Sequence, residues 1–80
     1  MQVLLFHSTQ CLVCQAILPT LEELPLTLID IDARPDDCVP YDLRAVPTFI
    51  IKDGDREIDR KIGFMEPERI AEWLTEWSVI

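Results

Sequence analysis

The sequence has few glycines and few basic residues: two Gly among 80 residues, and seven Lys and Arg against 15 Asp and Glu. So little glycine excludes long flexible linkers. The formal net charge of −8 repels phosphate backbones and anionic lipid headgroups, so we expect no nucleic-acid partner and no membrane partner. No apolar run approaches the roughly 20 residues of a membrane span. The apolar run 3–6 is too short for a signal-peptide core and has no positive residues before it.

Cysteine is also scarce, with three residues in all. An odd number does not suit the disulfide framework of a secreted protein, so the pair Cys11-x-x-Cys14 indicates metal or redox chemistry in a reducing compartment. We therefore expect a cytoplasmic protein. The chain length, with 49% hydrophobic and 28% charged residues, predicts a single globular domain over residues 1–80.

The first half of the chain predicts two buried strands joined by a helix. Short apolar runs at 2–6 and 26–32 are typical of strands in a parallel sheet. Between them, apolar residues at helical spacing predict a helix over about 12–24, which Pro19 is expected to kink without ending it. Its apolar stripe consists of Leu12, Ala16, Ile17, Leu21 and Leu24. A right-handed crossover would place the two strands side by side in parallel.

A short helix is expected next, over about 36–43. Asp36 and Asp37 follow a proline and favour a helix start, because short acceptor side chains cap free amide groups. Asp30 and Asp32, which alternate out of the end of the second strand, are read as solvated carboxylates and not as metal ligands.

The second half predicts a hairpin followed by a helix. Strand-like runs at 49–52 and 57–62 flank Asp53-Gly54, a strong hairpin signal. Pro67 opens a final helix, and its apolar stripe is expected in the core as Ile70, Trp73, Leu74 and Trp77. The sequence therefore predicts an α/β domain with helices on both faces of its sheet.

Three segments together resemble the thioredoxin-like superfamily: FHSTQCLVCQAILPTLEEL, LIDIDARP and YDLRAVPTFIIKDGDREIDRKIGF. They combine a Cys-x-x-Cys that opens a helix, a proline five residues later, and Val46-Pro47-Thr48 before a Lys-Asp-Gly hairpin. The resemblance implies a thioredoxin fold in minimal form: a βαβ unit, a short helix and a ββα unit, with a four-stranded mixed sheet. The extra N-terminal strand and helix of larger thioredoxins have no counterpart, as in small glutaredoxin-like redoxins.

The chemistry expected of the pair is thiol-disulfide exchange. Cys11 at a helix N-terminus faces unpaired amides that lower a thiol pKa, so we interpret it as the attacking nucleophile. Cys14 lies one turn further in and is expected to resolve the mixed disulfide. The resemblance implies protein disulfides as substrates, recharging by a thioredoxin reductase-type partner, and no cofactor. The alternatives are a glutathione-coupled glutaredoxin and a non-catalytic binding module on the same fold.

The resemblance also implies that the segment around Pro47 lies opposite the dithiol and forms part of the site. The peptide bond between Val46 and Pro47 is expected to be cis and to face the dithiol, which leaves the Val46 backbone free to pair with an extended substrate. Leu12, Val13 and Phe64 are expected to form an apolar rim around Cys11 that suits docking of a protein.

Several residues depart from the family. Leu12-Val13 replaces the Gly-Pro usual in thioredoxins and the Pro-Tyr usual in glutaredoxins, so the redox potential does not carry over. Gln10 replaces the tryptophan that usually precedes the first thioredoxin cysteine. Leu5 stands where thioredoxins keep a buried aspartate. Glutathione is not the expected reductant, because Gly63-Phe64 replaces the Gly-Gly pair of family glutathione sites.

A zinc site is the competing interpretation of the cysteines. His7, Cys11, Cys14 and Cys38 would supply a Cys3His ligand set. Structural zinc sites usually pair two short-spaced couples, whereas His7 and Cys38 are isolated, so we expect no metal. We interpret His7 as a packing or hydrogen-bonding residue at the end of the first strand, with general base as its alternative. We interpret Cys38 as a bystander, with a regulatory thiol as its alternative.

Overall fold

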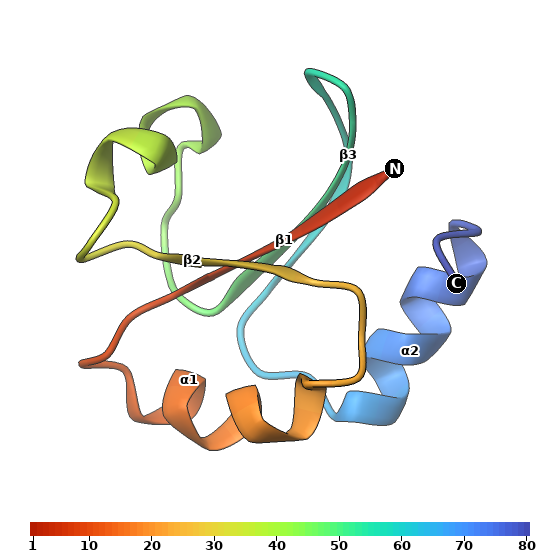
Figure 1. The fold of residues 1–80 in the computed structure, drawn as a ribbon, viewed down its shortest axis with the longest axis horizontal. Helices are drawn as coiled ribbons and strands as arrows, with labels where there is room; N and C mark the ends of the chain where they lie inside the picture. The colour runs from red at the N-terminus through yellow and green to blue at the C-terminus, as the bar shows by residue number, and fades with distance from the viewer.

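One four-stranded sheet forms the centre of the structure, a computed structural model that describes residues 1–80 (Figure 1). Its strand order is β2-β1-β3-β4. The strands are β1 (Gln2–His7), β2 (Thr27–Asp30), β3 (Thr48–Asp53) and β4 (Arg56–Ile62). β1 pairs in parallel with β2 and antiparallel with β3, and β3 pairs antiparallel with β4. The sheet is therefore mixed, and the predicted parallel pairing of the first two strands is confirmed.

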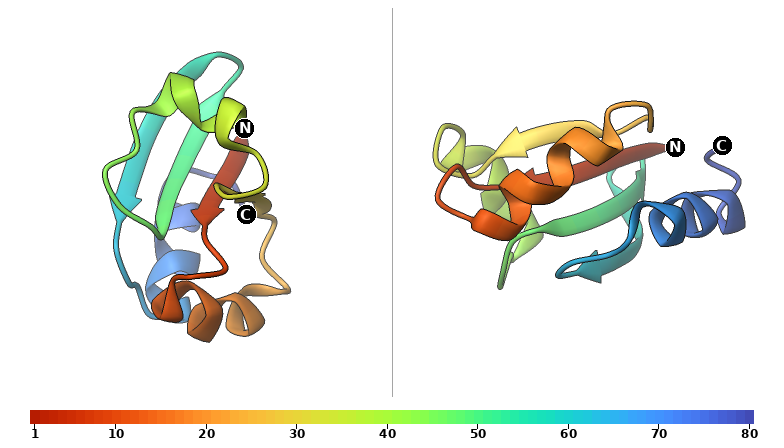
Figure 2. Two further views of the ribbon diagram at one scale, coloured as in Figure 1. Left: turned by 90° about the vertical axis from the view of Figure 1, so that its left-hand side faces the viewer. Right: turned by 90° about the horizontal axis from the view of Figure 1, so that it is seen from below.

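Helices cover both faces of this sheet. The α-helices α1 (Leu12–Ile17) and α2 (Pro67–Glu76) lie on one face, and the 3-10 helix η2 (Pro35–Tyr41) lies on the other (Figures 1 and 2). This is the four-stranded architecture with two covered faces that the sequence predicts. The hairpin between β3 and β4 turns at Gly54, whose φ of +60° falls in the left-handed region that glycine tolerates.

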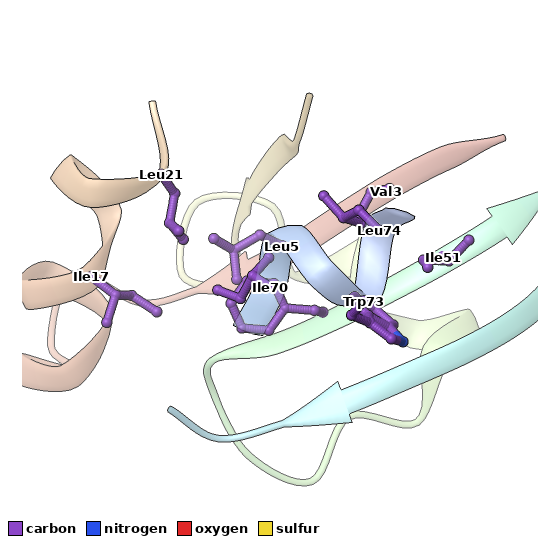
Figure 3. Packing of buried hydrophobic residues seen from close by; sticks show 9 residues of the cluster. Val3, Leu5, Ile17, Leu21, Ile51, Ile70, Trp73 and Leu74 are labelled. Carbon is purple, nitrogen blue, oxygen red and sulfur yellow. The ribbon is translucent and has the colours of Figure 1, made fainter. Parts of the chain in front are cut away.

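The core consists of two clusters, one on each face of the sheet, because successive strand residues point to opposite faces. Val3 and Leu5 of β1 point toward the two α-helices, and Leu4 and Phe6 point toward η2. Figure 3 shows the first cluster, in which side chains of α1, α2 and the sheet converge. Burial on both faces explains why β1 reads as a continuous apolar run and not as an alternating one.

The first predicted helix is shorter than expected. The α-helix ends at Ile17, and the chain continues as the 3-10 helix η1 (Leu18–Leu21) with Pro19 in its first turn. Proline has no N–H and its ring clashes with the carbonyl four residues earlier, so Pro19 ends the α-helical geometry instead of only kinking it. The predicted apolar stripe is also narrower, because Leu12 and Ala16 are exposed.

The segment after β2 differs from the prediction in two ways. The expected helix over 36–43 is the 3-10 helix η2, which contains Pro40 and ends two residues earlier. Asp36 and Asp37 lie in its first turn, but no side chain caps the helix, and Asp37 forms an ion pair with Arg34 at 2.6 Å. The predicted strand over 26–32 is limited to β2, because the Asp30 carboxylate accepts the backbone N–H groups of residues 32 and 33 and bends the chain.

Helix α2 packs on the sheet through Ile70, Trp73 and Leu74, which are buried. Trp77 is 38% exposed, so its predicted place in the core is wrong. It follows the last helical residue, Glu76, and lies at the exposed end of the stripe. Asp59 of β4 holds both indoles, since its Oδ2 accepts Trp73 Nε1–H at 2.9 Å and Trp77 Nε1–H at 3.2 Å.

Asp59→Asn is expected to destabilise the protein by about 1 kcal/mol at pH 7, because indole donors bond more strongly to a charged acceptor than to a neutral amide. The hydrogen bond from Trp73 lowers the pKa of Asp59 in the folded chain. This contribution is therefore present above the unfolded carboxyl pKa of about 3.9 and is lost as the pH falls through the folded value. Urea denaturation at pH 7 and pH 2.5 measures it.

Asp55→Asn provides the control, because Asp55 is an exposed carboxylate in the turn of the same hairpin. It should leave the urea midpoint within experimental error at both pH values. An Asp59→Asn deficit of equal size at pH 7 and pH 2.5 would contradict the charge-based explanation.

Candidate active site

The two cysteines of the Cys-x-x-Cys motif lie at the start of α1 in different environments. Cys11 is the N-cap residue, with extended backbone angles and a half-buried side chain. Its Sγ accepts the backbone N–H of Cys14 at 3.2 Å. Cys14 is fully buried within α1. The helix therefore presents one thiol to solvent and keeps the other beneath it.

This difference in environment separates the acidities of the two thiols. A hydrogen bond from the Cys14 side chain is the main reason that the pKa of Cys11 is lowered, and the backbone amides of Val13 and Cys14 add to the effect against an opposing cost of burial. Burial is the main cause that raises the pKa of Cys14 to about 11, and its hydrogen bond to Cys11 acts in the same direction. Cys11 is thus the thiol that ionises first.

Iodoacetamide is expected to alkylate Cys11 selectively in the reduced protein at pH 7. A thiol with a pKa near 11 is ionised in only about one molecule in ten thousand at pH 7, and the thiolate is the nucleophile. The midpoint of the Cys11 pH–rate profile should lie below that of an ordinary thiol, whereas Cys14 should react only after denaturation. Peptide mapping by mass spectrometry measures both rates, and alkylation of Cys14 as fast as Cys11 in the folded protein would contradict this order.

The loop before β3 faces Cys11. The peptide bond between Val46 and Pro47 is cis, as the resemblance implies, and the Cys11 thiol lies 3.8 Å from the Val46 carbonyl oxygen to which it donates. Thr48 Oγ1 donates to the Ala45 carbonyl at 2.6 Å, and the Gly63 N–H donates to the Pro47 carbonyl at 2.8 Å. The loop is therefore fixed by the sheet on one side and meets the Cys11 thiol on the other.

The side chains expected to form an apolar rim are exposed. Leu12 is 86%, Val13 44% and Phe64 55% exposed. Leu12 and Val13 follow Cys11 directly, and Phe64 follows Gly63, which is bonded to Pro47. Phe64 also lines a cavity of about 380 Å³ between the end of β4 and α2, and neither cysteine of the motif lines that cavity.

The four candidate zinc ligands do not form a metal site, since no three His, Cys, Asp or Glu side chains are grouped closely enough. Cys38 packs against the cluster on the η2 face, and its Sγ donates to the Arg34 carbonyl at 3.4 Å. Burial raises the pKa of the Cys38 thiol. His7 ends β1, and its Nδ1 is buried without a hydrogen-bond partner.

Two residues of the site were missed in the sequence. Ser8 is buried, and its hydroxyl donates to the Asp32 carboxylate at 2.5 Å. Asp32 is exposed, as the interpretation of it as a solvated carboxylate expects, but the sequence did not show that it also accepts this bond. A partial signal exists, because Ser8 follows the predicted strand 2–6 and Asp32 ends the predicted strand 26–32, and parallel neighbours end at the same edge of a sheet. Nothing in the sequence shows that their side chains bond.

The thioredoxin family model matches residues 1–76 of the chain. The chain belongs to the thioredoxin family. It is 31% identical over 81 residues to a thioredoxin of Staphylococcus aureus, a match that covers 91% of this chain and 78% of that protein. As a thioredoxin with its Cys-x-x-Cys in place, it is a thiol-disulfide oxidoreductase.

Solved thioredoxin structures share the fold. Thioredoxin 1 of Thermosipho africanus superposes with a TM-score of 0.79 at 24% identity, covering 96% of this chain and 93% of that one. A mutant thioredoxin of Halobacterium salinarum gives a TM-score of 0.84 at 20% identity, covering 95% of this chain and 73% of that one. None of the helices of this thioredoxin is long and apolar enough to cross a membrane.

Proposed function

We propose that this thioredoxin reduces protein disulfides with Cys11 as the nucleophile and Cys14 as the resolving thiol. The observation that carries the proposal is the inequality of the two thiols: the Cys11 pKa is lowered at a half-buried position, and the Cys14 pKa is raised in the core. An attacking thiol must be ionised and reachable, whereas a resolving thiol must be close and shielded.

The exchange takes place in two steps. The Cys11 thiolate attacks one sulfur of the substrate disulfide; the substrate S–S bond breaks, and the released substrate thiolate takes up a proton. Cys14 then loses its proton and attacks Cys11 Sγ, which forms the Cys11–Cys14 disulfide and releases the second substrate thiol. Two electrons and two protons pass from the protein to the substrate.

The substrate is an extended segment of a folded or partly folded protein. It lies along the loop before β3, where the Val46 backbone pairs with it and Pro47 supplies a surface without an amide donor. The exposed side chains of Leu12, Val13 and Phe64 provide the apolar contact.

The oxidised protein is recharged by a thioredoxin reductase-type partner in the cytoplasm, and it needs no cofactor of its own. The residues around Pro47 support a protein reductant over glutathione. Ala45 precedes Val46, and the bulky, exposed Phe64 follows Gly63 where family glutathione sites have a second glycine.

Insulin reduction tests the proposal in two parallel assays, one recharged by thioredoxin reductase with NADPH and one by glutathione with glutathione reductase. Turnover is expected with the first system. Turnover only with glutathione would establish the glutaredoxin alternative. No turnover with either, while dithiothreitol reduces the Cys11–Cys14 disulfide, would identify a non-catalytic module.

A further inference from the structure

Ser8 makes four hydrogen bonds in the turn between β1 and α1. It is only 6% exposed. Its carbonyl oxygen accepts the Cys11 N–H at 3.1 Å and the Gln15 Nε2–H at 3.0 Å. Its hydroxyl oxygen accepts the Gln10 N–H at 3.1 Å. The backbone that carries Cys11 is thus fixed relative to Ser8.

Asp32 in turn fixes the Ser8 hydroxyl. The 2.5 Å bond to its Oδ2 commits the hydroxyl hydrogen to the carboxylate, so the oxygen lone pairs are left facing the Gln10 N–H. A hydroxyl donating to a charged acceptor is among the strong hydrogen bonds of proteins. The bond joins segments 24 residues apart, just past the ends of the parallel strands β1 and β2.

The geometry points to Asp32 as a positioning residue for disulfide exchange: its carboxylate holds Ser8, and Ser8 holds the turn that places Cys11 Sγ against the Cys14 amide. This inference rests on the proposed role of Cys11 as the attacking thiol. The hydrogen bonds of Asp32 go to Ser8 and to Asp30, and none joins it to a thiol or to the loop before β3, so we expect its effect to pass through Ser8.

A direct electrostatic effect of Asp32 on Cys11 would change the reactivity of the thiol in the opposite direction to a positioning effect. A carboxylate near a thiolate disfavours the charged sulfur, so removing it would make Cys11 more reactive. Loss of positioning makes Cys11 less reactive, because the thiolate loses its well-aligned amide donor. Asp32 is not among the groups that shift the Cys11 pKa directly.

The test is the pH dependence of Cys11 alkylation by iodoacetamide in the reduced full chain, measured for Asp32→Ala, Ser8→Ala and the double variant. Asp32→Ala should slow the reaction about fivefold at pH 7 and move its midpoint to higher pH. The double variant should be no slower than Ser8→Ala, because a residue that acts only through Ser8 has no effect without it.

Two further variants separate charge from positioning. Asp32→Asn keeps an acceptor oxygen for the Ser8 hydroxyl and should stay within about twofold of the wild type. Asp55→Ala removes an exposed carboxylate that lies in the β3–β4 turn, and it should leave the profile unchanged.

Three results would overturn the inference. Asp32→Ala could be alkylated faster than the wild type or at the same rate. Alternatively, adding Asp32→Ala to Ser8→Ala could slow alkylation as much as it does in the wild type. The failure of the proposed function looks different: the wild-type protein itself would then show no preference for Cys11 over Cys14. Far-UV circular dichroism checks the fold of each variant, and Asp32→Asn gives the comparison should any alanine variant be unfolded.

Discussion

The Cys11→Ser variant is expected to lose at least about a thousandfold of its insulin-reducing rate, because serine cannot form the mixed disulfide and no other thiol can replace Cys11. Cys14 is buried and its pKa is raised to about 11, so it is shielded from the substrate and almost entirely protonated at pH 7. Turbidity of precipitating insulin B chain, followed with thioredoxin reductase and NADPH, measures the rate.

Cys14→Ser and Cys38→Ser complete this experiment. Cys14→Ser should attack normally but stall, so that a mixed disulfide between Cys11 and the insulin chain accumulates and is seen by non-reducing mass spectrometry. Cys38 packs on the opposite face of the sheet and should be replaceable without loss of rate. A mixed disulfide on Cys14 in the Cys11→Ser variant would reverse the assignment of roles.

Leu5→Asp is expected to destabilise the fold by about 4 kcal/mol at pH 7, which is most of the stability of a domain this size. Leu5 has no exposed surface and packs within the cluster between the sheet and the α-helices. A carboxylate there would lie among apolar side chains without a donor. Urea denaturation followed by far-UV circular dichroism measures the loss.

The pH dependence identifies the cause of this loss. Burial raises a carboxyl pKa in the folded state, so the folded variant holds its proton longer than the unfolded one, and its stability should fall as the pH rises through that raised value. The loss is therefore smallest near pH 4. Leu5→Met keeps the volume and apolar character and should cost less than about 1.5 kcal/mol. An Asp variant as stable as the Met variant at pH 8 would contradict the expectation.

The sheet could be predicted because its strands depend on patterns that are local in sequence. Residues 3–6 form an uninterrupted apolar run that is typical of a strand buried on both faces, and a turn glycine links β3 to β4. The 3-10 helices are harder to predict from the sequence. Their apolar spacing resembles that of an α-helix, and the difference lies in hydrogen bonds that Pro19 and Pro40 remove.

The residues of the candidate site also fall into those that local sequence patterns predict and those that they do not. Cys11 and Cys14 could be proposed from the sequence because their spacing is itself the signal, and Pro47 could be proposed because it stands in a recognisable order with them. Ser8 and Asp32 were missed because their bond joins segments 24 residues apart, and each residue alone is an ordinary polar residue after a strand. Trp77 was misplaced because a periodic pattern does not show where its helix ends.

The hydrogen bonds of Asp59 to two indoles determine what tryptophan fluorescence can report in this protein. Trp73 and Trp77 are the only tryptophans of the chain, and both donate to the same carboxylate oxygen. The residue before Cys11 is Gln10 and not a tryptophan. Intrinsic fluorescence therefore monitors the attachment of α2 to the sheet and the ionisation of Asp59, and it gives no direct view of the dithiol. The redox state of the protein therefore has to be followed through the reactions of its thiols. The tryptophan emission spectrum gives an independent measure of folding.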